Sequence, residues 1–295
     1  MKKYLCVDVG GTAIKMGILD EEGTIYETKK VKVPPTIEEM YQVIVDAFFH
    51  EDNLEGVALS MPGAVDSEKG IIGGSSAIDY IHGPHIKEDL ESRLHVRVEM
   101  ENDANCAALA EVWKGAASDV DDCCFIVSGT GIGGAVVKNR RIHKGVHLHG
   151  GEFGYMIAQF DFDTHEMHTW SEMGSTVAVV KNVAKAKGID ASSLNGQDIF
   201  DHYHDDPIYE KYVDQYYYVL ANGIYNLQYA YDPQKIVIGG GISARSDLLD
   251  EVNQRLDVIF KTFTHAKVRP TVFTCQYQNE ANLLDKWPSS LSTLF

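Results

Sequence analysis

The chain contains the same short unit twice, and this repetition constrains its fold more than any other feature. Each unit is an apolar strand, a glycine-rich bend and a returning apolar strand, and the two units span 4–19 and 124–137. Two apolar runs joined by such a bend predict a hairpin. We interpret the two hairpins as an internal duplication, with one copy in each of two domains.

The bends of these hairpins are of a kind that can bind phosphate. The first is Gly10-Gly11-Thr12 and the second is 128–134, and a third bend, 239–241, follows the strand-like run 235–238. Glycine after a strand lets the backbone approach a ligand closely and point its amide groups at phosphate oxygens. The sequence leaves open that two of the three bends are only structural turns.

The second bend also matches the G-x-G-x-x-G pattern of dinucleotide-binding proteins. That pattern binds a pyrophosphate when a helix begins at the glycines. Residues 135–140 instead predict a strand and a turn, so we exclude NAD binding.

A carboxylate beside a carboxamide marks another position, in the run Glu101-Asn102-Asp103-Ala104-Asn105. A strand-like stretch at 96–100 precedes this run, and a helical stretch at 106–113 follows it. Open α/β sheets bind ligands at the ends of their strands. Asp103 can therefore serve as a general base, or it can simply cap the helix that follows.

The rest of the chain reads as helices and strands of an α/β protein. Further helices are predicted at 36–50, 85–94, 177–188, 208–231, 246–263 and from 282 to the end, and a strand is predicted at 56–60.

The charge of the chain limits the partners it can have. Its 295 residues contain 26 Lys and Arg against 43 Asp and Glu, a formal net charge of −17. This argues against nucleic acid or an anionic membrane as the main partner. We expect no signal peptide and no membrane span. The five cysteines, an odd number, suit reduced core thiols in a cytoplasmic protein.

Taken together, these motifs resemble, in the same order, those of the ROK family of sugar kinases and repressors. The resemblance runs from about residue 4 to residue 284 and rests on 8–12, 101–105, 129–134, and Asp232-Pro233 before 239–241. It implies an α/β, two-domain, actin-like ATPase fold (ribonuclease H-like), with ATP and sugar in the cleft between the domains. The expected domains are a smaller one at 1–105 plus 281–295 and a larger one at 106–280.

The resemblance implies an ATP-dependent kinase of the glucokinase or fructokinase kind, which phosphorylates a hydroxyl of a hexose or small glycoside. Asp8 would help to hold the Mg²⁺ of Mg-ATP. The family often has Lys directly after the Thr of the first bend, where this chain has Ala13, so Lys15 is only a candidate phosphate contact. The residues expected to bind ATP are Asp8, Gly10, Gly11, Thr12, Gly129, Thr130, Gly131, Gly133, Gly239, Gly240 and Gly241.

Asp103 matches the catalytic Asp of the family, a general base that would accept the proton of the attacking sugar hydroxyl. Asn102 can both donate hydrogen bonds to sugar hydroxyls and accept them. Tyr155 stands where the family has a His, so the preference among hydroxyls can differ. The residues expected to contact the sugar are Gly63, Ala64, Asn102, Asp103, Glu152, Tyr155 and Glu172, and 76–82 is a candidate wall of this site.

One family feature is missing, the cysteine cluster that binds zinc after G-E-x-G-H. No Cys lies between Cys124 and Cys275, and tetrahedral zinc needs thiolate or imidazole ligands. We expect no structural zinc, and we expect other contacts, such as those of Phe160 and Trp170, to fix this loop. A His-only metal site stays open from His143, His147, His149, His165 and His168.

Three alternatives to a kinase follow from the same motifs. ROK repressors carry a helix-turn-helix domain ahead of the first strand, and we expect none here because the strand begins at Tyr4. A catalytically inactive sugar-binding or regulatory ROK protein would bind sugar without consuming ATP. A non-sugar ATPase would hydrolyse ATP without sugar. Members of the family commonly dimerise, so a homodimer stays open.

Overall fold

The computed structural model describes residues 1–277, which divide into two compact units. Of these residues, unit 1 contains Met1–Lys114 and Gly145–His149, and unit 2 contains Gly115–Lys144 and 150–277. Helix α3 (Asp103–Trp113) belongs to unit 1, whereas the predicted domain boundary at Asn105 falls within this helix. The helix predicted from 282 and the predicted return of 281–295 to the first domain lie outside the described residues.

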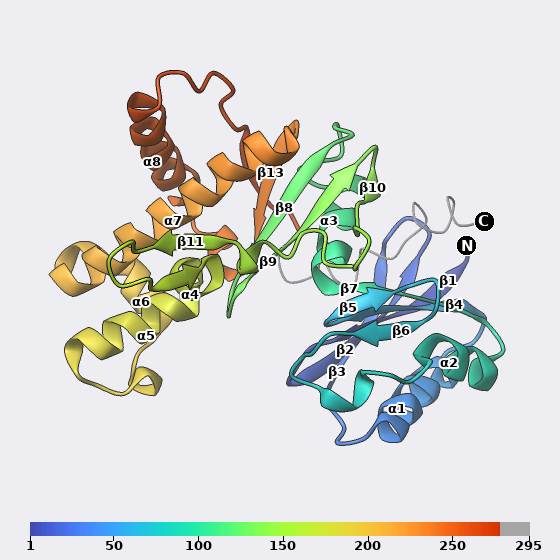
Figure 1. Ribbon diagram of the computed structural model, residues 1–295. Coiled ribbons are helices and arrows are strands. Elements are labelled where there is room, and N and C mark those ends of the chain that lie inside the picture. The colour runs from blue at the N-terminus through green and yellow to red at the C-terminus, as the bar shows by residue number, and fades with distance from the viewer. Residues whose placement is uncertain (278–295) are drawn as a thin grey trace. The chain divides into compact units, whose positions relative to one another are not determined.

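Unit 1 is built on a five-stranded mixed sheet with the strand order β3-β2-β1-β4-β7 (Figure 1). Strands β1 (Lys3–Val9), β2 (Ala13–Asp20) and β3 (Ile25–Lys32) are antiparallel, while β4 (Leu54–Met61) and β7 (Arg97–Asn102) extend the sheet in parallel with β1. Strands β5 (Ala64–Asp66) and β6 (Ile71–Gly73) form a small separate hairpin.

Helices cover both faces of this sheet. Helices α1 (Ile37–His50) and α2 (Ile86–Leu94) lie together on one face and α3 lies on the other (Figure 1). The apolar stripe of α1, which includes Met40 and Ile44, packs in one core with strand residues such as Leu59. The helices predicted at 36–50 and 85–94 are therefore confirmed.

Unit 2 repeats this sheet, with the order β10-β9-β8-β13-β14. Strands β8 (Cys123–Ser128), β9 (Ile132–Lys138) and β10 (Arg141–Ile142) are antiparallel, and β13 (Lys235–Gly239) and β14 (Val272–Thr274) extend the sheet in parallel with β8. The strand order and the strand directions of this sheet are the same as those of the sheet in unit 1. The predicted duplication is therefore confirmed.

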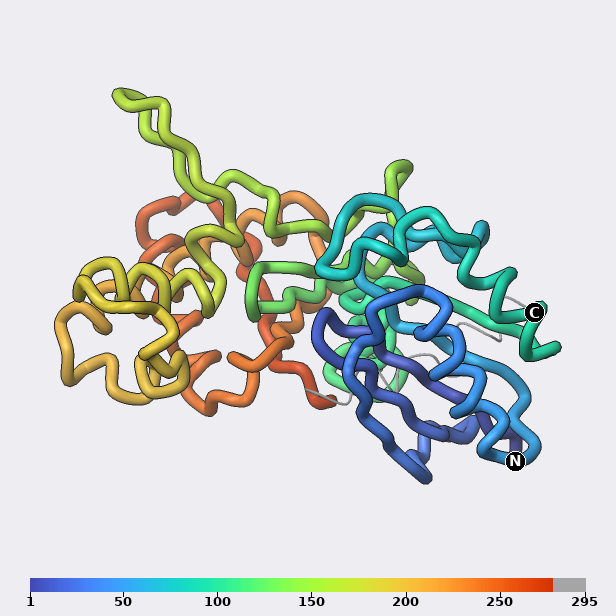
Figure 2. The backbone as a smooth tube through the Cα atoms, turned by 90° about the horizontal axis from the view of Figure 1, so that it is seen from below, coloured from blue at the N-terminus to red at the C-terminus, as the bar shows by residue number. Residues whose placement is uncertain are grey.

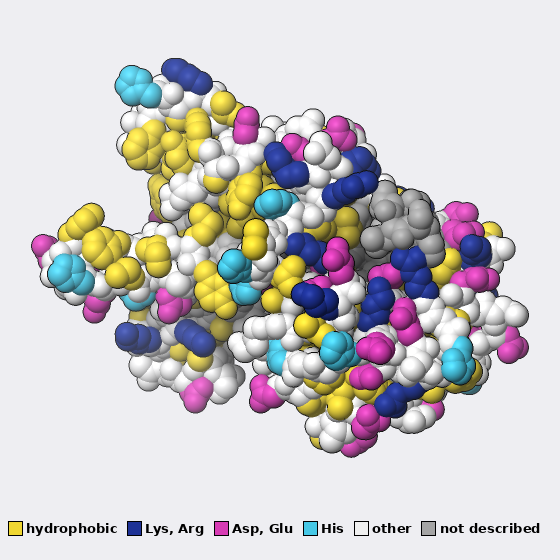
Figure 3. Space-filling view, turned by 45° about the vertical axis from the view of Figure 1, so that its right-hand side comes forward, with side chains coloured by type: hydrophobic (Ala, Val, Ile, Leu, Met, Phe, Trp, Pro, Cys, Tyr) yellow, Lys and Arg dark blue, Asp and Glu magenta, His cyan; other side chains and the backbone are white. Residues whose placement is uncertain are grey.

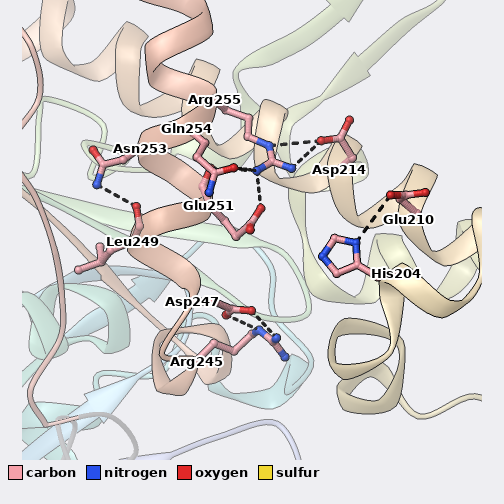
Figure 4. Close-up of polar contacts among 10 residues, drawn as sticks. All are labelled: His204, Glu210, Asp214, Arg245, Asp247, Leu249, Glu251, Asn253, Gln254 and Arg255. Carbon is pink, nitrogen blue, oxygen red and sulfur yellow. Dashed lines mark hydrogen bonds and ion pairs between the residues drawn. The ribbon is translucent and has the colours of Figure 1, made fainter.

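The helices of unit 2 form a large second layer. The predicted long helices are α5 (Thr176–Lys187), α7 (Pro207–Tyr231) and α8 (Leu248–Thr262), while the short α4 (Trp170–Gly174) and α6 (Gly196–Asp201) were not expected. Arg255 of α8 ties this helix to α7 by a 2.7 Å ion pair with Asp214 (Figure 4). Among residues 1–277, no helix is both long enough and apolar enough to cross a membrane.

Candidate active site

The parallel strands of unit 1 bring three polar residues into one row. The register pairs Asp8 with Ser60 and Ser60 with Glu101. Asp8 and Ser60 are both buried, and the Ser60 hydroxyl donates a 3.0 Å hydrogen bond to Asp8 Oδ1. The Lys15 ammonium lies 3.8 Å from Asp8 Oδ2. The row therefore places the Asp8 carboxylate two residues before Gly10, the start of the first glycine bend.

The first bend is closed by its own backbone. The Gly10 N–H donates to the Ala13 carbonyl at 3.0 Å, and the Thr12 carbonyl accepts from the Val33 N–H. A Cβ atom on Gly11 would lie 3.1 Å from the Ala77 side chain. The segment 76–82, the expected wall of the sugar site, thus packs against this bend.

Asn102, and not Asp103, caps helix α3. Its carboxamide oxygen accepts hydrogen bonds from the N–H groups of Ala104 and Asn105, at 2.9 and 3.1 Å. Asp103 is the first residue of the helix, where the helix dipole favours a negative charge. The alternative that Asp103 is the N-cap is therefore wrong, and the helix begins at Asp103 rather than at Cys106.

The Asn102 cap also reaches a neighbouring turn. Its Nδ2 donates to the carbonyl of Gly63 at 3.1 Å, and Gly63 has a left-handed φ of +96° in the turn between β4 and β5. Glu101 Oε1 accepts from Asn105 Nδ2 at 3.0 Å, which fixes the start of the helix further. Unit 1 therefore brings Gly63, Asn102 and Asp103 together at the ends of β4 and β7, and Ala64 follows as the first residue of β5.

In unit 2 the second and third glycine bends meet. A Cβ atom on Gly240, which has a φ of +85°, would lie 2.2 Å from the Ser128 carbonyl oxygen. The Thr176 hydroxyl donates to the Gly129 carbonyl at 2.9 Å. A pocket of about 760 Å³ lies beside these bends and is lined by Gly129, Thr130 and Gly241 together with α5 and α6 residues.

Arg245 joins two walls of this pocket. Its guanidinium makes a two-bonded ion pair with Asp247, at 2.9 and 2.7 Å (Figure 4), and a further ion pair with Asp201 of α6. The Asp247 hydrogen bonds raise the pKa of Arg245, and the hydrogen bond from Arg245 lowers the pKa of Asp201. Because two carboxylates face one guanidinium, this wall suits a neutral group better than a phosphate.

The second bend leads into a strand, not a helix. Strand β9 begins at Ile132, whose N–H donates to Ser171 Oγ at 2.9 Å, and the Ser171 hydroxyl lies 3.3 Å from the Ile132 carbonyl. The helix that NAD binding would need is therefore replaced by a strand at this point.

The expected sugar residues of unit 2 lie on two short segments. Glu152 is half-buried and Tyr155 is 74% exposed, on a single helical turn closed by a hydrogen bond from the Tyr155 N–H to the Glu152 carbonyl. Glu172 is exposed and forms a capping box with Thr169 at the start of α4. The backbone hydrogen bond from Thr169 lowers the pKa of Glu172. The expected sugar residues therefore form two sets, one in each unit.

A hairpin of β11 (Ile157–Phe160) and β12 (Met167–Thr169) stands where the family has its zinc segment. It projects from unit 2 as a narrow arm (Figure 2), and apolar side chains gather on it at the left of Figure 3. The Phe160 ring packs edge-to-face on Phe162 at 4.6 Å and stacks with His165 at 6.3 Å.

At the base of the arm, the Trp170 side chain is 2% exposed, and the backbone N–H of Trp170 donates to the Met156 carbonyl at 2.7 Å. Phe160 and Trp170 thus make contacts of the kind expected to fix this loop. Within residues 1–277, no three His, Cys, Asp or Glu side chains are grouped so that they could hold a metal ion. The absence of structural zinc stays a prediction.

Several of these residues were not found from the sequence. Ser60, Ser171, Thr176 and Arg245 hold the bends or the pocket, but each is a single polar residue outside any motif. Ser60 carried the clearest signal, because it is the one polar residue in the otherwise apolar run 56–61.

Comparisons with known proteins agree with this architecture. The ROK family model matches residues 4–284. A β-glucoside kinase of Listeria innocua is 34% identical over 272 residues, covering 89% of this chain and 92% of that protein. The crystal structure of a ROK family protein from Streptococcus pneumoniae in complex with sucrose has a TM-score of 0.90 and 32% identity, covering 99% of both chains.

A ROK family glucokinase from Streptomyces griseus, solved with glucose and AMPPNP, has a TM-score of 0.77 and 26% identity, covering 96% of this chain and 97% of that one. These matches define the class of protein, which is an α/β protein with the actin-like ATPase fold of the ROK sugar kinase structures. The chain belongs to the ROK family.

Proposed function

We propose that this chain transfers the γ-phosphoryl group of Mg-ATP to a hydroxyl of a β-glucoside, with Asp103 as the general base. The chain is an ATP-dependent sugar kinase. The narrower substrate class is supported by its 34% identity to the Listeria β-glucoside kinase. The observation that carries the assignment of Asp103 is its place at the head of α3, directly after a cap that is bonded to Gly63.

Each polar residue of unit 1 has a distinct part in this proposal. A sugar hydroxyl is a weak nucleophile, and a carboxylate within hydrogen-bond reach can accept its proton as the γ-phosphoryl group moves across. One amide hydrogen of Asn102 is used by Gly63, and the other is available to a sugar hydroxyl. Gly63 and Ala64 would contact the sugar through their backbone, and Glu152, Tyr155 and Glu172 would complete the sugar site.

The glycine bends and the unit 2 pocket would hold ATP. The first and second bends would bind the phosphates through Gly10, Gly11, Thr12, Gly129, Thr130, Gly131 and Gly133, and the nucleoside would enter the pocket beside Gly239, Gly240 and Gly241. Mg²⁺ is usually bound by one or two carboxylates together with phosphates and water. The Asp8 carboxylate, at the end of β1 before the first bend, fits this pattern.

The remaining expectations concern partners. A net charge of −17 supports a protein that does not bind nucleic acid. A cytoplasmic location and a homodimer stay predictions.

The test is ATP consumption with magnesium across glucose, N-acetylglucosamine, cellobiose and aryl β-glucosides. We expect ATP consumption to require a β-glucoside. We also expect mass spectrometry to detect the phosphorylated glycoside. Turnover with free glucose alone would contradict the β-glucoside assignment. ATP hydrolysis that no sugar changes would favour a non-sugar ATPase.

A further inference from the structure

The segment 76–82, between β6 and α2 (Figure 1), contacts both the first glycine bend and the turn at Gly63. Ala77 packs on Gly11 at the start of this segment, and His82 ends it. His82 Nε2 lies 2.9 Å from the Ser76 hydroxyl oxygen, which holds the ring in one orientation. In that orientation the ring packs on Gly63, since a Cβ atom there would lie 3.3 Å from His82 Cε1. His82 therefore lies against the turn whose carbonyl holds Asn102.

The other ring nitrogen of His82 has no such partner. Nδ1 is buried and makes no hydrogen bond to any residue in the described part of the chain. Buried polar atoms in proteins are almost always paired, with protein, water or ligand. Nδ1 is bonded to Cε1, the ring atom that faces Gly63, so the unpaired nitrogen lies beside the proposed sugar turn.

Two other buried polar atoms without a partner among residues 1–277 do not point to a ligand. Trp170 Nε1 and the Tyr217 hydroxyl belong to side chains that are almost fully buried in the core of unit 2. His82 differs because its residue is only half-buried and its ring packs on Gly63, the residue whose carbonyl accepts from Asn102.

We propose that His82 is a specificity-determining residue of the sugar site, whose Nδ1 exchanges a hydrogen bond with one hydroxyl of the bound sugar. The inference rests on the proposed function, because it places the sugar at Gly63 and Asn102. A neutral imidazole donates from one nitrogen and accepts at the other, and a sugar hydroxyl can match either arrangement. His82 takes no part in the transfer of the phosphoryl group.

Two substitutions at His82 distinguish the contribution of Nδ1 from that of Nε2. His82→Gln can still reach Ser76 with its amide but has no polar atom at the place of Nδ1, whereas His82→Asn keeps a polar atom near Nδ1 and loses the contact with Ser76. We expect His82→Gln to raise KM for the sugar on the order of tenfold, with KM for ATP and kcat unchanged. His82→Asn should raise it less. Ser76→Ala is the matched control for loss of the Nε2 contact alone.

Deoxy sugars identify the hydroxyl. With the native chain, one monodeoxy derivative of the accepted sugar should lose roughly tenfold in kcat/KM through the missing contact, and His82→Gln should show no further loss with that derivative. An equal additional loss with every derivative, or a parallel rise in KM for ATP, would mean that His82 is structural and would overturn the proposal.

Two further outcomes are distinguishable. If the native chain binds and phosphorylates no sugar, the proposed function fails and this inference fails with it. If the variants do not fold, the imidazole ¹⁵N resonances of the native protein decide. The Nδ1 resonance of His82 should move when the accepted sugar is added without ATP, and an unchanged resonance at saturating sugar would overturn the proposal.

Discussion

The two units share one sheet but differ at the ends of their parallel strands. Counted back from the Gly-Thr pair of each bend, Asp8 of unit 1 corresponds to Ile126 of unit 2. The paired residues across the three parallel strands are Asp8, Ser60 and Glu101 in unit 1, and Ile126, Ile238 and Thr274 in unit 2. The same topology therefore carries a polar row in one copy and a largely apolar row in the other.

The two units therefore share a fold but not the side chains that could do chemistry. Duplication supplies a glycine bend after the first strand of each sheet. Such a bend can bind phosphate through its backbone amides, independently of the side chains on the strand before it. In unit 2 the residues behind the bend, Ile126 and Ile238, are fully buried in the core. In unit 1 the same places hold Asp8 and the Ser60 hydroxyl that bonds to it. We infer that the acid–base and metal chemistry belongs to unit 1, and nucleoside binding to unit 2.

The largest loss of stability should come from placing a carboxylate in unit 2 at the position that corresponds to Asp8. Ile126→Asp would bury a charge where the native side chain is 0% exposed. An unpaired buried charge should reduce the free energy of unfolding by about 4 kcal/mol or more, a large part of the 5–15 kcal/mol typical of proteins. Urea denaturation measures this loss, with Ile126→Val as the control. A stable Ile126→Asp variant would show that the two rows are interchangeable.

A smaller loss of stability is expected from a substitution where the second and third glycine bends meet in unit 2. Gly240→Ala combines a left-handed φ of +85° with a Cβ atom 2.2 Å from the Ser128 carbonyl oxygen. The strain should reduce stability by about 2 kcal/mol and raise KM for ATP, because the bends must separate. Gly188→Ala, which has a left-handed φ of +67° but meets open space outside the bends, is the control. Equal KM values for the two variants would speak against a nucleotide role for this junction.

The cap of α3 should matter more for catalysis than for stability. Asn102→Ala removes a helix cap, which costs about 1 kcal/mol, and it also removes the bond to Gly63. We expect kcat/KM for the sugar to fall by more than stability alone explains. Thr36→Ala removes the cap of α1 in the same unit and is the matched control. Similar kinetics of the two variants would contradict the special role of Asn102.

The smallest change in stability is expected from a substitution on the projecting β11–β12 hairpin. Phe162 is 83% exposed, so Phe162→Ser should change the free energy of unfolding by about 0.5 kcal/mol or less. Thermal unfolding measures it, with Phe160→Ser, which loses two ring contacts, as the comparison. A much larger loss for Phe162→Ser would mean that this side chain is buried in an assembly in solution.

The sequence predicted the duplication because periodicity and glycine bends are local signals that survive in each copy. It did not predict α4, the β11–β12 hairpin or the partners of the bends. These depend on contacts between distant residues, such as Ser171 with Ile132 and Thr176 with Gly129. The sequence singled out Asp103 as the candidate general base, but whether Asn102 or Asp103 caps the helix depends on the φ and ψ of a single residue, which no pattern specifies.

The central claim is that unit 1 supplies the general base. The most direct measurement is the rate of phosphoryl transfer by Asp103→Asn in single turnover with bound ATP and saturating sugar. We expect a rate lower by about 10³-fold, within the range for loss of a general base, with sugar and ATP affinities retained. The exposed Glu88→Gln serves as the control. A rate close to that of the native chain, with both ligands bound, would contradict the assignment of Asp103 and the division of roles between the units.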